Sequence, residues 1–192
     1  AQAEWAAARG AEALEVTPDW SALVNDRANS FAEELAAIAA LDLPMTVVMD
    51  VNQLNEAQLA LAAEAAIDAG AASLQAGNGF GAPVSADQVR ALRQLTGGRC
   101  AIKAAGGIRD LERALDLVEA GAMALGTGHG PALIKALRIG AADAPGQSWA
   151  HLPHLMALCA VCKLVSGPLA VLVWRAGRRH VAVEASAGEQ GE

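Results

Sequence analysis

Residues 100–128 read CAIKAAGGIRDLERALDLVEAGAMALGTG, in which two apolar runs flank an amphipathic stretch. An apolar run ends in Gly106 and Gly107, an amphipathic stretch follows Asp110, and a second apolar run begins after Gly121. Asp is a good N-cap and Gly a good terminator, so the middle stretch is predicted to be a helix. Strands that are apolar throughout and separated by a helix are typical of parallel βα units buried on both faces.

The same unit recurs from residue 1 to about 140. Helix ends are predicted at the Gly-Ala pairs Gly10-Ala11, Gly70-Ala71 and Gly121-Ala122, and helix N-caps at Asn55, Ser85 and Asp110. Strands are expected over 13–17, 46–50, 72–77, 100–107 and 122–128, with about six helices between them. The chain is therefore expected to be α/β. Five parallel strands suit either an open doubly wound sheet or part of an eight-stranded barrel.

The end of the chain differs in character from the rest. Residues 141–150 contain Pro and Gly and are predicted to be a linker, which leaves residues 151–192 as a C-terminal extension. The extension is predicted to form a helix over about 152–166 and then a hairpin over 169–185. A membrane-spanning helix is the less favoured interpretation, because Lys163 interrupts the apolar run.

Composition narrows the classes of partner. The chain has 192 residues, a formal net charge of −7 and three cysteines. The lack of excess Lys and Arg argues against a nucleic-acid partner, and no membrane partner or cofactor is expected. A compact anionic metabolite remains a candidate ligand, because backbone amides and one or two cations suffice to bind it. So few cysteines suit a reducing compartment, so we expect a cytoplasmic protein.

Residues with polar or reactive side chains lie where the predicted strands end, which is where βα folds place their active sites. Glu15, Gln75 and Lys103 lie on the first, third and fourth strands. A lysine inside an apolar strand is costly unless it is paired or functional. Lys103 is therefore either a functional group or the partner of Glu15 or Asp50 in a structural ion pair. Glycine-rich loops after the last three strands predict a phosphate cradle.

Three segments carry a resemblance to a known family. IKAAGGIRDLERALDLVEAGAMALGTG (102–128) resembles the closing third of class I deoxyribose-phosphate aldolases. Upstream, RGAEALEVTPDWSAL (9–23) and TVVMDVNQLNEAQL (46–59) resemble two further segments of that family. The resemblance implies a (βα)₈ TIM-type barrel, of which about five βα units are present and the first three lacking. It also implies cleavage of 2-deoxyribose 5-phosphate to glyceraldehyde 3-phosphate and acetaldehyde through a lysine Schiff base.

The resemblance also assigns roles to individual residues. Lys103 matches the family's second lysine, which assists proton transfer, and Glu15 matches an aspartate that helps to move protons. Phosphate-binding positions are matched by Gly79, Gly106, Gly107, Gly128 and His129.

Two departures from the family bear on catalysis. Gln75 occupies the position of the Schiff-base lysine, and a carboxamide nitrogen is not nucleophilic. Thr46 replaces a buried lysine. Three interpretations are compatible with these departures. The protein is an aldolase that uses Lys103 instead, or a catalytically silent homologue that binds a sugar phosphate or acts as a regulatory subunit. The third interpretation is a truncated or fused fragment of nucleoside-catabolism enzymes. Five strands cannot close a barrel, and a homodimer is one way to cover the open edges.

A second, shorter resemblance lies in the extension. LMALCAVCKLVS (155–166), followed by RRHVAVEAS (178–186), is similar to a helix and strand of bacterial cytidine deaminases. Cys159 matches a zinc ligand there, but Val161 replaces the family's glutamate. A catalytic zinc ion needs three protein ligands, and one helix cannot supply them, so no metal site is predicted.

Overall fold

The computed structural model describes residues 1–49, 51, 54–143, 171–174 and 181–182. Its elements, in chain order, are α1 (Gln2–Ala8), β1 (Ala13–Val16), α2 (Trp20–Val24), α3 (Ala28–Ala39), β2 (Met45–Met49), α4 (Glu56–Asp68), β3 (Ser73–Ala76), α5 (Ala86–Thr96), β4 (Ala101–Ala105), α6 (Leu111–Glu119), β5 (Ala124–Gly126), α7 (Gly130–Asp143), β6 (Val171–Trp174) and β7 (Val181–Ala182).

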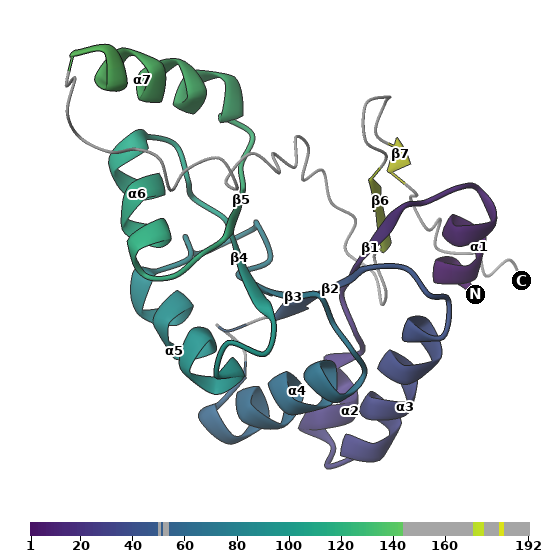
Figure 1. The fold of residues 1–192 in the computed structure, drawn as a ribbon. Helices are drawn as coiled ribbons and strands as arrows, with labels where there is room; N and C mark the ends of the chain where they lie inside the picture. The colour runs from purple at the N-terminus through teal and green to yellow at the C-terminus, as the bar shows by residue number, and fades with distance from the viewer. Residues whose placement is uncertain (50, 52–53, 144–170, 175–180, 183–192) are drawn as a thin grey trace, which may run out of the picture.

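The sheet confirms the predicted partial barrel. Strands β1 to β5 pair in parallel and in sequence order, with no reversal of direction along the sheet. The sheet curls, and helices α2 to α7 lie along its outer side (Figure 1). A doubly wound sheet would carry helices on both faces and reverse its strand order. The five strands therefore form an open segment of a TIM-type barrel.

The helix boundaries follow from local chemistry. Asn55, Ser85 and Asp110 each accept a hydrogen bond from a backbone amide in the first turn of α4, α5 and α6, as predicted. At the other end of α4, Gly70 takes a φ of +83°, which a residue with a side chain rarely adopts. Asp26 follows α2 with a φ of +56°, a conformation that Asp tolerates better than most residues.

The core lies between the sheet and the surrounding helices. One set of strand side chains, including Leu14, Val47 and Leu74, is almost completely buried. They pack in one apolar cluster with helix residues such as Phe31 on α3 and Leu92 on α5. Burying a side chain of this size stabilises the fold by about 1.5–3 kcal/mol. Because strand side chains alternate, the residues between these core positions point to the other face of the sheet.

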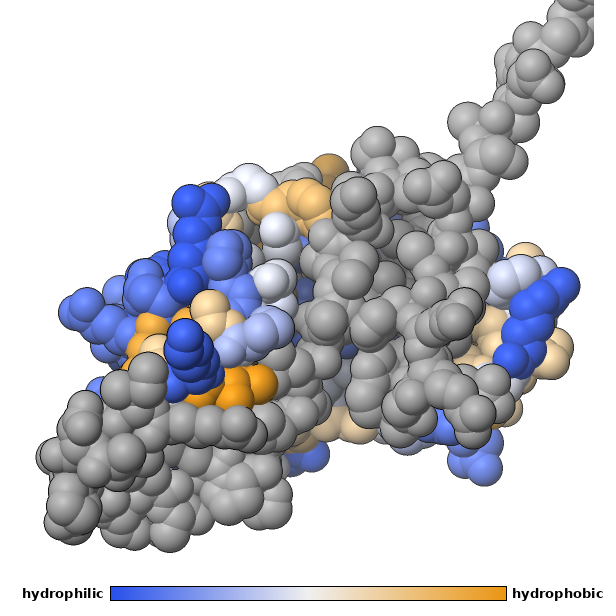
Figure 2. Space-filling view, turned by 90° about the horizontal axis from the view of Figure 1, so that it is seen from above, coloured by the Kyte–Doolittle hydropathy of each residue, from blue (hydrophilic) through white to orange (hydrophobic). Residues whose placement is uncertain are grey.

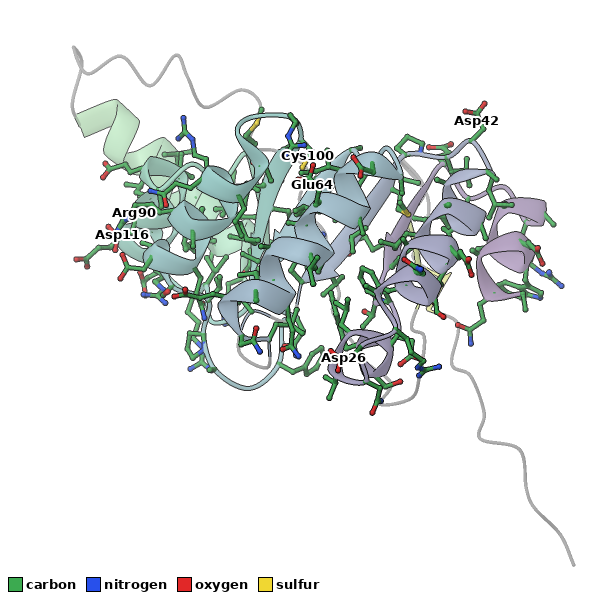
Figure 3. The ribbon with its side chains drawn as sticks, turned by 90° about the horizontal axis from the view of Figure 1, so that it is seen from below. Asp26, Asp42, Glu64, Arg90, Cys100 and Asp116 are labelled. Carbon is green, nitrogen blue, oxygen red and sulfur yellow. The ribbon has the colours of Figure 1, made fainter. Side chains whose placement is uncertain are left out.

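Charged side chains lie outside this core. Asp26, Asp42, Arg90 and Asp116 are exposed and point away from the sheet (Figure 3). Seen from above, hydrophilic residues occupy the outer margins of the visible described surface, with small hydrophobic patches between them (Figure 2).

The described part of the extension adds to the sheet. Strand β6 pairs antiparallel with β1, and β7 pairs antiparallel with β6, as the two strands of the predicted hairpin should, while the residues between β6 and β7 lie outside the described ranges. Helix α1 lies beside β6. The predicted helix over 152–166 lies outside the described residues. The predicted division of the chain into 1–140, a linker over 141–150 and an extension over 151–192 stays a prediction. An antiparallel strand on the edge of β1 was not foreseen from the sequence.

Candidate active site

Glu15, Gln75 and Lys103 project from the face of the sheet opposite the outer helices. Their immediate neighbours Leu14, Leu74 and Ile102 belong to the core, and side chains alternate between the two faces of a strand. Gln75 and Lys103 are paired directly in the β3–β4 register. The structure therefore brings together the three candidate catalytic side chains that were read from the sequence.

Lys103 and Glu15 form an ion pair across the curled sheet. The Nζ atom of Lys103 on β4 donates a hydrogen bond to Oε1 of Glu15 on β1, with β2 and β3 between them. The side chains are only 8% and 20% exposed. Taking two charges out of water is costly, and close pairing offsets that cost. Of the two predicted partners Glu15 is confirmed, whereas Asp50 lies outside the described residues.

Gln75 is buried beside this pair and is only 3% exposed. Its Nε2 donates a hydrogen bond of 2.9 Å to the carbonyl oxygen of Gly77, which follows at the end of β3. Its Oε1 is buried and accepts no hydrogen bond from any residue that the structure describes. The side chain is thus anchored at its nitrogen end only.

Two hydroxyl residues, which were not singled out as a pair from the sequence, complete this polar face. Thr46 on β2 and Ser73 on β3 are register partners, and their hydroxyl oxygens are 2.7 Å apart. Thr46 is also the register partner of Glu15. The alternation of Ser73 and Gln75 in an otherwise apolar strand was the available signal.

The glycine loops after β3 and β4 pack closely together. Gly77 has a φ of +80°, and a Cβ atom there would lie 2.3 Å from the carbonyl oxygen of Ala105. A Cβ on Gly106 would lie 3.5 Å from the Cα of Gly79. The amide of Val84 donates to the Gly106 carbonyl at 3.2 Å. Side chains at Gly77 or Gly106 would therefore fill the junction of the two loops.

The third loop, after β5, is tied to the second. The Thr127 hydroxyl donates to the carbonyl of Ile108 at 2.6 Å and accepts from the amide of His129 at 3.0 Å. Gly128 and His129 are exposed, and α7 begins directly after them. A Cβ on Gly128 would meet no atom within 4 Å.

Through these contacts the predicted phosphate-binding loops lie together at the carboxyl ends of β3, β4 and β5. Within the described part of the chain, no group accepts a hydrogen bond from the amides of Gly79, Gly106 or Gly107. Such amides, together with the start of a helix, form the kind of surface that binds anions. The binding role of each glycine and of His129 stays a prediction.

Two features of this edge were not foreseen. Phe80, between Gly79 and Gly81, is 40% exposed, although it is a large apolar side chain. Arg113 on α6 donates a hydrogen bond to the carbonyl of Val84 and so holds the loop after β3 against α6. Neither feature carries a spacing signal in the sequence, since side-chain exposure and a contact between α6 and a distant loop both depend on the tertiary structure.

The sequence predicts neither a metal site nor a membrane-spanning helix. No group of three or more His, Cys, Asp or Glu residues is placed to hold a metal ion in the described ranges. Cys159 and Val161, which carry the second resemblance, lie outside those ranges. None of the helices over the residues described is long and apolar enough to span a membrane.

Comparison with known proteins gives a consistent set of relatives, although no family model matches the chain. The deoxyribose-phosphate aldolase of Crocosphaera subtropica is 36% identical over 135 residues, which are 70% of this chain and 61% of that protein. The aldolase of the same name from Aquifex aeolicus is 36% identical over 126 residues, 63% of this chain and 57% of that protein. The chain thus spans about three fifths of the length of these curated relatives.

A solved structure supports the same relationship. The protein described as "QR15, an Aldolase" is 30% identical to this chain and superposes with a TM-score of 0.69. The match covers 74% of this chain and 67% of that one. The predicted family resemblance and the partial barrel are both confirmed by these findings.

Proposed function

We propose that this chain, which belongs to the deoxyribose-phosphate aldolase family, binds a small sugar phosphate where β3, β4 and β5 end. We propose also that it does not cleave this ligand. The observation that carries this proposal is Gln75. A buried carboxamide stands on β3 where the family resemblance expects the Schiff-base lysine, and the glycine-containing loops after β3 and β4 pack directly beside it.

Phosphate binding rests on the three glycine loops. Gly79 and Gly106 approach each other closely, and neither has a side chain to block an incoming anion. The start of α7, directly after His129, adds the partial positive charge of a helix N-terminus. A phosphate monoester fits this chemistry, because its oxygens can accept several amide hydrogen bonds at once.

The loss of cleavage rests on the available nitrogen atoms. A Schiff base forms when a neutral amine attacks the substrate carbonyl and water leaves. The Gln75 nitrogen is an amide and cannot do this. Lys103 is engaged as an ammonium by the Glu15 carboxylate, so its lone pair is not free for attack.

Cleavage through Lys103 is the second candidate function. Lys103 is the register partner of Gln75, which puts an amine on the strand next to the replaced position. Borohydride in the presence of 2-deoxyribose 5-phosphate distinguishes the two candidates. Any imine on Lys103 would be reduced by hydride to a stable secondary amine. We expect no mass increase in the peptide that contains Lys103, and such an increase would favour the second candidate.

Binding itself is tested by calorimetric titration of the full chain with 2-deoxyribose 5-phosphate. Gly128→Asp places a carboxylate at the cradle and is expected to weaken binding at least tenfold, about 1.4 kcal/mol, by charge repulsion. Gly97→Asp is the matched control, since it makes the same change in open space at the end of α5, near the start of β4. Equal affinities for the two variants would contradict the proposed cradle.

A further inference from the structure

The nitrogen and oxygen atoms of the Gln75 carboxamide differ in their hydrogen bonding. The atom that contacts the Gly77 carbonyl must be the nitrogen, because a carbonyl oxygen accepts hydrogen bonds and does not donate them. This contact fixes the orientation of the amide. Oε1 is therefore the amide atom that does not contact Gly77, and it can act only as an acceptor.

A buried acceptor without a donor is rare in proteins, because it has lost its water and gained nothing in exchange. Oε1 of Gln75 is such an atom within the described part of the chain. Its register partner Lys103 carries three donor hydrogens, yet the ammonium turns to Glu15. The protein thus keeps an unused acceptor next to the glycine loops.

We propose that Oε1 of Gln75 accepts a hydrogen bond from a hydroxyl group of the bound ligand, an inference that rests on the proposed function. The site then selects phosphate monoesters that present a hydroxyl to Gln75, as alditols and ring-closed sugars do. An open-chain aldehyde presents a carbonyl oxygen, whose lone pairs face those of Oε1 without a proton between them.

The spacing along β3 agrees with such a ligand. Gln75 precedes Gly77, the first residue of the glycine loop, by two positions, and its Nε2 lies 2.9 Å from the Gly77 carbonyl oxygen. The carboxamide therefore lies where the glycine loop begins. A ligand whose phosphate binds this loop would place its carbon chain near Gln75.

The experiment compares two ligands on the unmutated full chain by calorimetry. They are 2-deoxyribitol 5-phosphate, which has a terminal hydroxyl, and its 1-deoxy analogue, which has a methyl group there. Inorganic phosphate is the probe for the cradle alone. We expect the hydroxyl compound to bind at least tenfold more tightly than the methyl compound, because the latter leaves Oε1 unpaired.

The Gln75→Met variant keeps the length of the side chain but removes both the acceptor and the Nε2 donor to the Gly77 carbonyl. It should abolish the difference between the two ligands, and its affinity for inorganic phosphate, measured alongside, reports any change in the glycine loop. Gln94→Met, at an exposed position of α5, is the matched control and should leave the difference intact.

The outcomes separate this inference from the proposed function. Equal affinity of the two ligands for the unmutated chain, with inorganic phosphate still binding, overturns the role of Gln75 alone. Failure of all three probes to bind a chain that circular dichroism shows to be folded overturns the proposed function as well. The comparison of ligands on the unmutated chain holds even where Gln75→Met fails to fold.

Discussion

Gln75 and Lys103 face the same interior from neighbouring strands, where they are register partners. One is a carboxamide held by the Gly77 carbonyl, and the other is an ammonium held by the Glu15 carboxylate. Neither nitrogen is a free amine. At the scale of single residues the site is therefore suited to hydrogen bonding and charge recognition.

Replacing Gln75 with lysine tests whether a missing amine explains the proposed absence of cleavage. Gln75→Lys puts an amine where the family resemblance expects the nucleophile, and the adjacent ammonium of Lys103 disfavours a second charge beside it. We expect the variant to release acetaldehyde from 2-deoxyribose 5-phosphate at least tenfold faster than the unmutated chain. Gln75→Met serves as the control for disturbing the position. A folded, ligand-binding Gln75→Lys protein with no gain in rate would mean that more than the nucleophile is missing.

At the scale of elements, the loops after β3 and β4 act as one unit. Gly77 fits against the backbone of Ala105, and Gly107 fits against Pro83. Both contacts are too close for a side chain. The carboxyl ends of β3 and β4 are thus held together by backbone packing.

Two glycines of the same loop provide a matched test of this packing. Gly77 and Gly81 both have positive φ, at +80° and +71°, but a Cβ on Gly81 would meet nothing within 4 Å. Alanine should cost about 1–2 kcal/mol at either position through backbone strain. Gly77→Ala should cost about 1–3 kcal/mol more, because its methyl group overlaps the Ala105 carbonyl. Urea unfolding measures both variants, and equal destabilisation would contradict the packing described.

Between the helices, an ion pair links α4 to the start of β4. Arg99 donates two hydrogen bonds of 2.8 Å to the carboxylate of Glu64. The hydrogen bonds from Arg99 lower the pKa of Glu64 from its ordinary value of 4.5. A depressed carboxylate pKa stabilises the folded state above that value, and the contribution disappears as the pH falls through the lowered pKa.

The pH dependence of the melting temperature of the Glu64→Gln variant tests this direction of the effect. We expect a melting temperature slightly below that of the unmutated chain at pH 7, with the difference shrinking as the pH falls below 4.5. Both side chains are about half exposed, so added salt should shrink the difference as well. Asp116→Asn neutralises an exposed carboxylate on α6 and serves as the control. A difference that grew on acidification would contradict the ion pair.

At the scale of the whole molecule, five parallel strands form an open segment of a barrel. An open edge exposes unpaired amides and carbonyls. On one side that edge is β1, which pairs with β6 from the C-terminal extension, whereas β5 ends the described sheet on the other side. The extension thus supplies backbone partners that further βα units supply in a closed barrel.

Local signals in the sequence predicted much of this molecule. The five strands and the caps at Asn55, Ser85 and Asp110 lie where hydrophobic period and turn chemistry place them. The choice of Glu15 as the partner of Lys103 depends on how strongly the sheet curls, which no local pattern encodes. The pairing of β6 with β1 joins segments more than 150 residues apart and depends equally on tertiary context.

We propose that the protein binds a sugar phosphate without cleaving it. The most direct measurement takes the full chain with saturating 2-deoxyribose 5-phosphate and records binding heat and released acetaldehyde on the same sample. We predict saturable binding, with acetaldehyde appearing no faster than in buffer alone. Catalytic release that Lys103→Met abolishes, or the absence of saturable binding to the folded chain, would contradict the account.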